Sequence, residues 1–221
     1  MSKTMNSYAT TSRYDTARTI FIASQKLLYP IETAANAIII YHRYANEVGD
    51  EKLQRANFVI IVSSFLFLAG KSTEHFRKIS EVLMVVLRLR GYKYDVSDPE
   101  KRKQMHEALI EQEQKILRAL SFVTNVDLPY NFILNIAKSE NFSCQTVRFA
   151  WGIVNELILF PESHGKTMTP VSMAVVALYI AQQTFHDHPN LPDAKNWWNF
   201  YRLSDEELVE SLILTKQLMV T

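Results

Sequence analysis

The chain has 221 residues, of which 48% are hydrophobic and 21% charged, and its 24 basic and 23 acidic side chains give a formal net charge of +1. This length suits one large domain or two small ones, and near-neutrality disfavours a protein whose main role is to grip nucleic acid through its phosphates. A single cysteine, Cys144, excludes an internal disulfide and a cysteine-rich zinc site and suits a reducing compartment.

The first half of the chain reads as a series of helices. Its glycines and prolines are few, and the alternating pattern of half-buried strands is scarce. Gly49 is placed to end the second helix, and Ser97 or Asp98 to begin the fifth, with Pro99 at its first position. Apolar residues at helical spacing predict helices over residues 13–28, 31–47, 53–68, 78–89 and 99–120.

The segment 125–130 interrupts this pattern and is interpreted as a linker. It divides the chain into a predicted N-terminal domain, residues 13–124, and a C-terminal domain, residues 131–221. Ser204 and Glu207 form a capping box for the last helix. Further helices are predicted near residues 130–138, 144–159, 170–184 and 204–219. We therefore expect an all-α fold of two bundles with about five helices each.

Residues 65–74 form the most informative stretch, because five consecutive apolar residues run directly into Gly70 and Lys71, with Glu74 three positions later. A helix that is apolar on every side should be buried, so a lysine at its end needs an acceptor or an exit to water. Two interpretations stay open. Lys71 either marks where a core helix meets the surface, or waits at an interface for a partner's carbonyl or carboxylate. Residues 178–181 weakly repeat residues 66–69 without the lysine, which slightly favours the interface.

Motifs of enzymatic chemistry are absent in usable form: there is no phosphate-cradling glycine loop, no Gly-x-Ser-x-Gly elbow and no His-Glu-x-x-His pair. We therefore expect no catalytic residue, no metal site and no cofactor. Glu107, Glu111 and Glu113 lie along one helix, where a solvated face explains most of them better than acid and base roles. The run His186–His188 fits an exposed loop better than a metal site, because no third ligand is indicated.

Two further pairs attract attention. His42 and Arg43 lie inside an apolar helix, and the simplest interpretation is that the helix reaches its polar face there. Trp197 and Trp198 are a large apolar pair just before the last helix, which they are expected to anchor on the second bundle. No apolar run reaches about eighteen residues, so a membrane span is not expected.

Several motifs in a fixed order resemble the cyclin box, and the resemblance covers nearly the whole chain, from about Arg13 to Met219. In the first domain the Leu-Ala-x-Lys-x-x-Glu segment and a later Ile-Leu-Arg-Ala-Leu-Ser-Phe segment are similar to those of cyclins. The His-Arg pair and the second domain resemble the transcription-class cyclins K, T and Q. The segments that carry the resemblance are 41–44, 68–74, 113–122, 127–130, 169–181 and 195–198.

The resemblance implies tandem cyclin folds and a non-catalytic regulatory subunit. Such a subunit binds and activates a cyclin-dependent kinase of the transcription class, which phosphorylates the C-terminal domain of RNA polymerase II. It is not itself an enzyme, and neither direct nucleic-acid binding nor membrane binding is expected. The implied localisation is nuclear, with a cytoplasmic pool left open.

Residue roles are likewise implied by the resemblance. The kinase-binding positions are Lys71, Glu113, Leu117, Phe122 and Glu74, with Glu113 the expected neighbour of Lys71. The positions that support the box are Arg13, His42, Arg43 and Ile60. Ser72 and Thr73 depart from the bulkier or acidic residues usual after the lysine. Ser12, Thr16 and Thr19 stand where mitotic cyclins carry a hydrophobic patch that docks substrates, so we expect that docking function to be absent.

Two alternatives remain. A TFIIB-like transcription factor core uses the same paired folds to bind DNA and polymerase, but it predicts a basic surface and usually a zinc ribbon, which the charge of +1 and the single cysteine disfavour. The other is an enzyme or helical scaffold unrelated to cyclins, for which no motif speaks.

Overall fold

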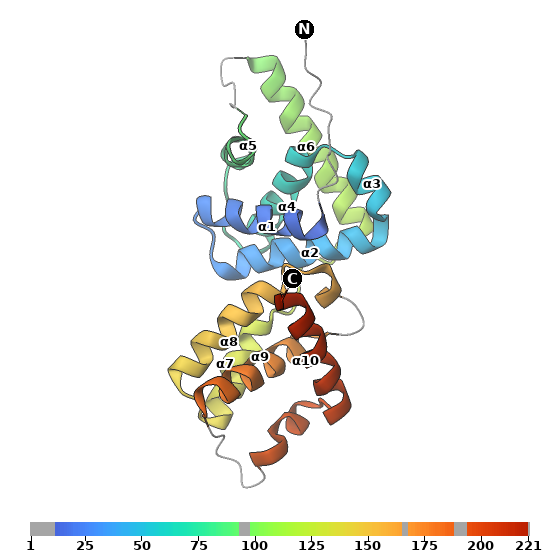
Figure 1. The fold of residues 1–221 in the computed structure, drawn as a ribbon. Helices are drawn as coiled ribbons and strands as arrows, with labels where there is room; N and C mark the ends of the chain where they lie inside the picture. Colours follow the sequence, from blue (N-terminus) through green and yellow to red (C-terminus); the bar gives the residue numbers. More distant parts are fainter. Residues whose placement is uncertain (1–11, 93–97, 165–167, 188–193, 221) are drawn as a thin grey trace. The chain divides into compact units, whose positions relative to one another are not determined.

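The computed structural model describes residues 12–92, 98–164, 168–187 and 194–220, and within these ranges every regular element is helical (Figure 1). The all-α prediction is confirmed. The elements are α1 (Arg13–Lys26), α2 (Ile31–Val48), α3 (Asp50–Arg55), α4 (Phe58–Ser72), α5 (Ile79–Leu89), α6 (Pro99–Ala119), α7 (Pro129–Glu140), α8 (Cys144–Leu157), the 3-10 helix η1 (Pro161–His164), α9 (Pro170–Phe185), the 3-10 helix η2 (Ala194–Tyr201) and α10 (Asp205–Val220).

Two compact units divide the chain, residues 1–126 and 127–221. The first contains α1 to α6, and the second contains α7 to α10 with η1 and η2. The division falls inside the segment interpreted as a linker. α7 begins within that segment at Pro129, because proline lacks only an amide hydrogen that the first helical turn does not use.

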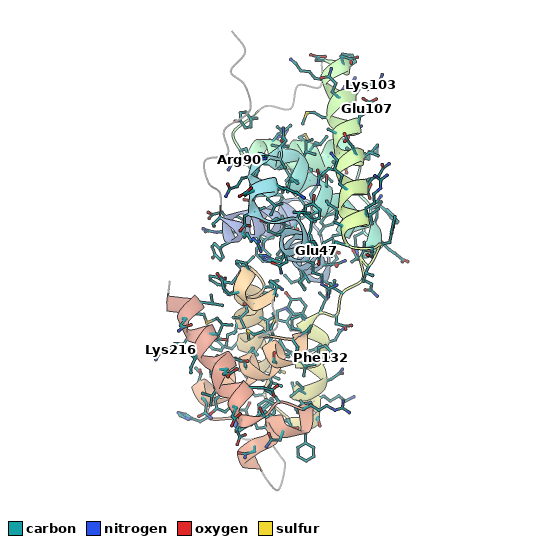
Figure 2. The ribbon with its side chains drawn as sticks, turned by 90° about the vertical axis from the view of Figure 1, so that its right-hand side faces the viewer. Glu47, Arg90, Lys103, Glu107, Phe132 and Lys216 are labelled. Atoms are coloured by element: carbon teal, nitrogen blue, oxygen red, sulfur yellow. The ribbon has the colours of Figure 1, made fainter. Side chains whose placement is uncertain are left out.

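The first unit is built around α4, which packs against α1, α2, α5 and α6. Its isoleucine and valine side chains, and those of Phe58 and Phe65, are buried, as expected for an apolar helix inside a bundle, whereas Phe67 is half-buried. Charged side chains lie outside: Lys103 and Glu107 project from the outer face of α6 (Figure 2).

The start of α4 differs from the prediction of one helix over residues 53–68. A short helix, α3, ends at Arg55, and Asn57 begins α4 as its N-cap, accepting hydrogen bonds from the amides of Val59 (3.0 Å) and Ile60 (3.3 Å). An asparagine oxygen satisfies amides that would otherwise lack an acceptor, so the chain gains by breaking the helix there. Gly49, Asp98 and the Ser204–Glu207 capping box end or begin their helices as predicted.

The second unit is built around α9, which packs against α7, α8 and α10. Trp197 is fully buried and donates from Nε1 to Gln182 Oε1 of α9 (2.9 Å). Trp198 donates from Nε1 to Asp205 Oδ1, at the first residue of α10 (2.7 Å). The tryptophan pair therefore joins α9 to α10, and the anchoring role predicted for it is confirmed. Among the described helices, none combines the length and apolarity needed to cross a membrane.

Candidate functional site

The last turn of α4 and the middle of α6 meet at an ion pair between Lys71 and Glu113. The Glu113 side chain is only 8% exposed, whereas that of Lys71 is 40% exposed. A buried carboxylate needs a compensating charge, and Glu113 Oε1 has no hydrogen bond besides this pair. The Lys71 ammonium also lies 4.7 Å from the centre of the Phe67 ring, within cation–π range. The ammonium is therefore held at the rim of the unit with part of its surface facing outward.

Glu113 is the exception to the solvated face expected for most of the three α6 carboxylates. Glu107 and Glu111 are exposed, but Glu113 lies on the stripe that also carries the fully buried Leu109 and Ile116. Spacing of three and four residues puts these side chains on one helical face. Glu113 is thus a charged residue in a core position, and Lys71 is its counter-ion.

The residues after Lys71 hold the end of α4 in place. Asn36 of α2 donates from Nδ2 to Ser72 Oγ (2.8 Å), and the hydroxyls of Thr33 and Thr73 lie 2.8 Å apart. Ser72 and Thr73 also donate to the Ala69 carbonyl (3.1 and 2.9 Å). The two hydroxyl residues that depart from the family pattern therefore bond α4 to α2, which fixes the direction from which Lys71 leaves the helix.

Gly70 permits a close backbone approach at the same helix end. Its carbonyl accepts from the His75 amide (2.8 Å), and a Cβ at this position would lie 2.5 Å from Tyr29 Oη and 2.9 Å from the His75 carbonyl oxygen. The chain turns back at Glu74, whose φ of 62° is in the left-handed region. Glu74 is exposed and forms no ion pair with another described residue, so the structure leaves it outside the Lys71–Glu113 pair.

Leu117 and Phe122 are brought together at the end of α6. The Phe122 amide donates to the Leu117 carbonyl (2.8 Å), and Ser121 and Phe122 both have positive φ, 49° and 62°. This left-handed turn ends the helix and projects Phe122, which is 69% exposed. Leu117 is half-buried and lies one turn after Glu113 on the same face. Four of the five residues predicted to bind a partner therefore lie on two helices that pack against each other. Lys71 is in the last turn of α4, and Glu113, Leu117 and Phe122 lie along the second half of α6 and just beyond its end.

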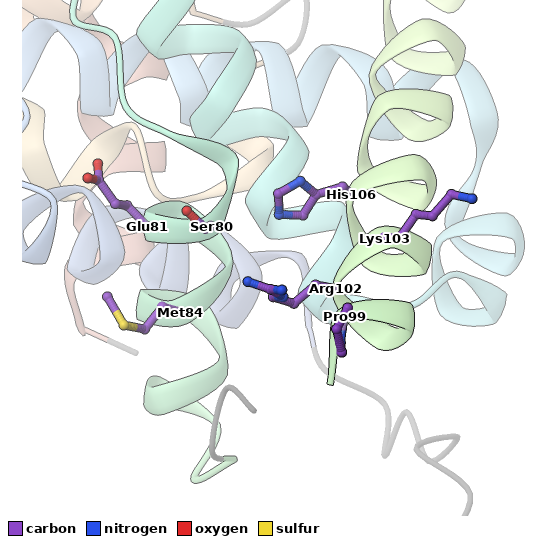
Figure 3. A pocket seen from close by; sticks show the side chains of 7 residues that line it. All are labelled: Ser80, Glu81, Met84, Pro99, Arg102, Lys103 and His106. Atoms are coloured by element: carbon purple, nitrogen blue, oxygen red, sulfur yellow. The ribbon is translucent and has the colours of Figure 1, made fainter. Parts of the chain in front are cut away.

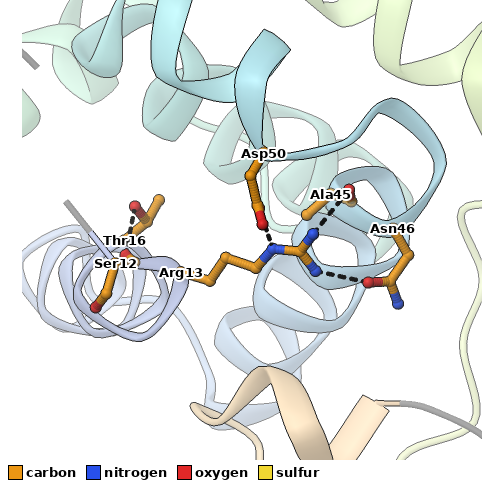
Figure 4. Close-up of polar contacts among 6 residues, drawn as sticks. All are labelled: Ser12, Arg13, Thr16, Ala45, Asn46 and Asp50. Atoms are coloured by element: carbon orange, nitrogen blue, oxygen red, sulfur yellow. Dashed lines mark hydrogen bonds and ion pairs between the residues drawn. The ribbon is translucent and has the colours of Figure 1, made fainter. Parts of the chain in front are cut away.

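Arg13 joins three elements near the start of the unit (Figure 4). Its Nε lies 2.5 Å from Asp50 Oδ1, Nη1 donates to Asn46 Oδ1 (2.6 Å) and Nη2 donates to the Ala45 carbonyl (3.2 Å). The guanidinium therefore bonds α1 to the end of α2 and the start of α3. The Ala45 carbonyl also accepts from the Gly49 amide (3.0 Å), so Arg13 adds a second donor at the end of α2, where the helix dipole favours a cation.

The other box-supporting residues divide by burial. His42 is fully buried, with its ring 5.1 Å from that of Tyr41, whereas Arg43 is exposed. The expectation that the helix reaches its polar face at both residues is therefore wrong for His42, because the polar face begins only at Arg43. Ile60 is a core residue at 9% exposure, and its carbonyl accepts from Ser64 Oγ (2.7 Å).

The hydroxyl residues of α1 are used within the helix. Ser12 Oγ accepts from the Asp15 amide (3.1 Å) and caps α1, while Thr16 and Thr19 donate to backbone carbonyls one turn earlier. The absence of a hydrophobic docking patch at these positions stays a prediction.

The histidine-rich run after α9 has a structural role at Asp187. Its Oδ2 accepts from the Ser143 amide (2.8 Å) and from Thr146 Oγ1 (2.6 Å), at the start of α8. A carboxylate is favourable at a helix N-terminus. His186 is exposed, and His188 lies outside the described residues. Within the described ranges no three His, Cys, Asp or Glu side chains are grouped to hold a metal ion.

Comparison with known proteins shows sequence similarity to several cyclins. No protein-family model matches the chain. Cyclin-K of Homo sapiens is 26% identical over 200 residues, which cover 86% of this chain and 33% of that cyclin. Cyclin-K of Danio rerio is 26% identical over 215 residues (92% and 49%), and Cyclin-T1-5 of Arabidopsis thaliana is 24% identical over 189 residues (83% and 32%). The chain thus spans between a third and a half of the length of these relatives.

Solved structures agree on the fold. A chain in the crystal structure of the yeast RNA Pol II CTD kinase CTDK-1 complex matches with a TM-score of 0.71 at 18% identity, covering 90% of this chain and 62% of that one. A chain of the yeast TFIIK (Kin28/Ccl1/Tfb3) complex matches with a TM-score of 0.63 at 16% identity, covering 93% and 84%.

The two helical units are tandem cyclin folds. The chain is thus similar in sequence to Cyclin-K and Cyclin-T, and its fold agrees with this similarity.

Proposed function

We propose that the chain is the non-catalytic regulatory subunit of a cyclin-dependent kinase, and that the kinase acts on the C-terminal domain of RNA polymerase II in the nucleus. The observation that carries this proposal is the half-exposed Lys71, held by the buried Glu113 at the end of α4. The exposed Phe122 supplies an apolar contact close to Leu117. Two similarities support the choice of kinase class: the sequence similarity to Cyclin-K and the structural match to a chain of an RNA Pol II CTD kinase complex.

The geometry suits recognition of a helix end on the kinase. An ammonium group has three donors, and the Glu113 carboxylate fixes its position without enclosing it. The outward donors can bond a partner's carbonyl oxygens. Phe122 and Leu117 can cover the apolar side of the same partner helix, since aromatic anchors dominate such contacts.

Activation then follows from differential binding. A kinase needs a glutamate of its αC helix paired with its ATP-binding lysine before phosphoryl transfer can occur. A cyclin surface that contacts αC only in this arrangement raises the population of the active state. The cyclin supplies no group to the reaction itself. A role in DNA binding is not favoured by any feature of the described residues, and the net charge of +1 opposes it.

The test removes both charges of the ion pair together. Lys71→Met with Glu113→Gln leaves no unpaired charge in the core, so the fold should survive. We expect its affinity for a co-expressed transcription-class cyclin-dependent kinase to fall about tenfold or more, because charge-assisted hydrogen bonds contribute about 1.5–3 kcal/mol each. Phosphorylation of a CTD heptad peptide, at limiting cyclin, should fall in parallel.

The matched control is Lys115→Met with Glu111→Gln, which removes an ion pair of the same type (2.8 Å) from the exposed face of α6. Exposed pairs contribute little, so this variant should bind and activate as the parent does. The proposal fails if no cyclin-dependent kinase is retained by the parent chain, or if the two double variants bind the kinase equally well.

A further inference from the structure

Two large apolar side chains beside the end of α4 are mostly exposed. Leu28, in the turn between α1 and α2, is 81% exposed, and Phe76, in the segment between α4 and α5, is 65% exposed. Single exposed apolar residues are common on protein surfaces and need no explanation. These two differ from single residues, because one arginine side chain holds both of their segments.

That arginine is Arg77. Its Nε donates to the Leu27 carbonyl (3.0 Å) and its Nη1 to the Phe76 carbonyl (2.9 Å), and its guanidinium lies 5.4 Å from the centre of the Tyr29 ring. Leu28 has a φ of 55°, a left-handed conformation that is unfavourable for residues other than glycine. Such a conformation persists where the surroundings fix the backbone, and it is frequent where a ligand is held. The structure therefore holds an exposed leucine and an exposed phenylalanine in fixed positions.

Both segments adjoin Gly70, the residue before Lys71. The His75 amide donates to the Gly70 carbonyl (2.8 Å), and a Cβ on Gly70 would lie 2.5 Å from Tyr29 Oη. His75 and Tyr29 are the chain neighbours of the two exposed apolar residues. The apolar pair therefore continues the surface on which the half-exposed Lys71 lies.

An open hollow of about 510 Å³ lies against Phe76 and is also lined by Arg77, Lys78 and Glu81. In Figure 3 the Glu81 side chain extends from the first turn of α5 on the side away from α6. Its negative charge offsets much of the positive charge of the two basic residues, so the hollow has no strong preference for an ion of either sign. The apolar pair is the distinctive chemistry of this surface, and a partner should cover it with apolar side chains.

The usual size of an interface also requires contacts beyond the Lys71–Glu113 pair. A stable protein–protein interface buries about 800 Å² on each partner and involves about 20–30 residues a side. Lys71, Leu117 and Phe122, with the mostly buried Glu113, supply only a small part of such an area. A kinase bound at Lys71 therefore covers neighbouring surface, and the segments that adjoin Gly70 are part of it.

We propose that Leu28 and Phe76 contact the same kinase as Lys71, and that Arg77 is a positioning residue that holds the two segments for this contact. The inference rests on the proposed kinase binding, and it extends the binding surface from the end of α4 to the α1–α2 turn. The pair contributes apolar burial, whereas Lys71 contributes directional, charge-assisted hydrogen bonds.

The test removes the apolar pair from the full chain. Leu28→Ser with Phe76→Ser changes only exposed side chains, so the urea unfolding midpoint should stay as in the parent. We expect its affinity for the same co-expressed transcription-class cyclin-dependent kinase to fall about tenfold or more, because two large apolar side chains lose their burial. Leu134→Ser with Phe200→Ser is the matched control. It replaces the same residue types at exposed positions of the second unit and should bind as the parent does.

The outcomes separate this inference from the proposed function. If the parent binds the kinase and the two double variants bind it equally well, the inference is overturned and the proposed function stands. A parent chain that binds no cyclin-dependent kinase overturns both. Sedimentation of the free chain tests a second copy as the occupant. Self-association that the Leu28→Ser, Phe76→Ser variant loses, without a loss of kinase affinity, assigns the pair to a contact between copies and overturns the inference.

Arg77→Met tests the positioning role. In the parent chain it should weaken kinase binding about twofold or more, because the two segments are no longer held together. In the Leu28→Ser, Phe76→Ser variant it should cause no further loss, since its effect passes through those two side chains. A loss by the same factor in both chains would show that Arg77 acts independently of the pair, and would overturn its positioning role.

Discussion

Tyr29 shows how one buried phenol is placed beside the end of α4. Its side chain is 8% exposed, its Oη has no hydrogen-bond partner among the described residues, and the Arg77 guanidinium lies 5.4 Å from the centre of its ring. Burial raises the pKa of Tyr29 to about 12, and the charge of Arg77 offsets only part of this rise. The phenol therefore contributes packing to the region next to Gly70, without a hydrogen bond.

Stability should fall in alkali because of this residue. The folded-state pKa of Tyr29 lies above the unfolded value of 10.0, so its contribution is complete below about pH 10 and is lost as the pH rises through about 12. Tyr29→Phe should remove that part of the alkaline loss. At about pH 8 the variant should match the parent within about 1 kcal/mol, since no hydrogen bond is lost.

Urea unfolding at pH values of about 8, 10 and 11 measures both effects. Tyr92→Phe, at an exposed position, is the matched control and should leave the pH dependence of the free energy of unfolding unchanged. An alkaline loss in Tyr29→Phe as steep as that of the parent would contradict the assignment.

At the scale of the elements, the bounds of the helices could be predicted closely, because capping residues in the sequence mark where several helices begin and end. Asp98 with Pro99 begins α6, Gly49 ends α2, and the Ser204–Glu207 pair begins α10. The break between α3 and α4 could have been found in the same way, from Asn57 as an N-cap. The strongly apolar run that follows concealed it.

The contacts between helices could not be predicted from the spacing of apolar residues. Glu113 differs from Glu111 only in its face of α6, and a short helical pattern leaves that face ambiguous. The pairing with Lys71, 42 positions earlier, was expected from resemblance to cyclins rather than from spacing. The bonds from Asn36 to Ser72 and from Thr33 to Thr73 depend on the register of α2 against α4, which no local signal fixes.

Gly70 gives a prediction at the contact between α4 and the turn that follows it. Glycine to alanine inside a helix normally stabilises by about 1 kcal/mol. At Gly70 the new methyl would meet Tyr29 Oη at 2.5 Å and the His75 carbonyl oxygen at 2.9 Å. Because one of these neighbours is backbone, we expect Gly70→Ala to lower the free energy of unfolding by about 1–3 kcal/mol, the usual cost of overpacking.

Gly152 of α8 is the matched control, because a Cβ there meets nothing within 4 Å. Gly152→Ala should raise the free energy of unfolding by about 0.5–1 kcal/mol. Chemical denaturation of the two variants should therefore give effects of opposite sign. A stabilising Gly70→Ala would show that Tyr29 and the turn at His75 move aside easily.

At the scale of the whole molecule, each unit has its own core. The first buries Ile38, Phe65 and Leu83 completely, and the second buries Ile133, Val176 and Trp197. The residues proposed to bind the kinase all belong to the first unit. A unit with a continuous core of its own is able to fold alone, so the proposed kinase-binding site should survive separation from the second unit.

A fragment of residues 12–126 tests this directly. We expect it to unfold cooperatively, with helical far-UV circular dichroism, and to retain the same cyclin-dependent kinase as the parent chain. A fragment of residues 12–108 is the control, since it ends before Leu109 and Ile116, two fully buried residues through which α6 packs on the core. Losing both side chains removes several kcal/mol of apolar burial, a large share of a domain's stability of about 5–15 kcal/mol, so this fragment should lack a cooperative transition. If residues 12–126 behave like residues 12–108, the first unit depends on the second for its stability, and the proposed kinase-binding site is a property of the intact chain.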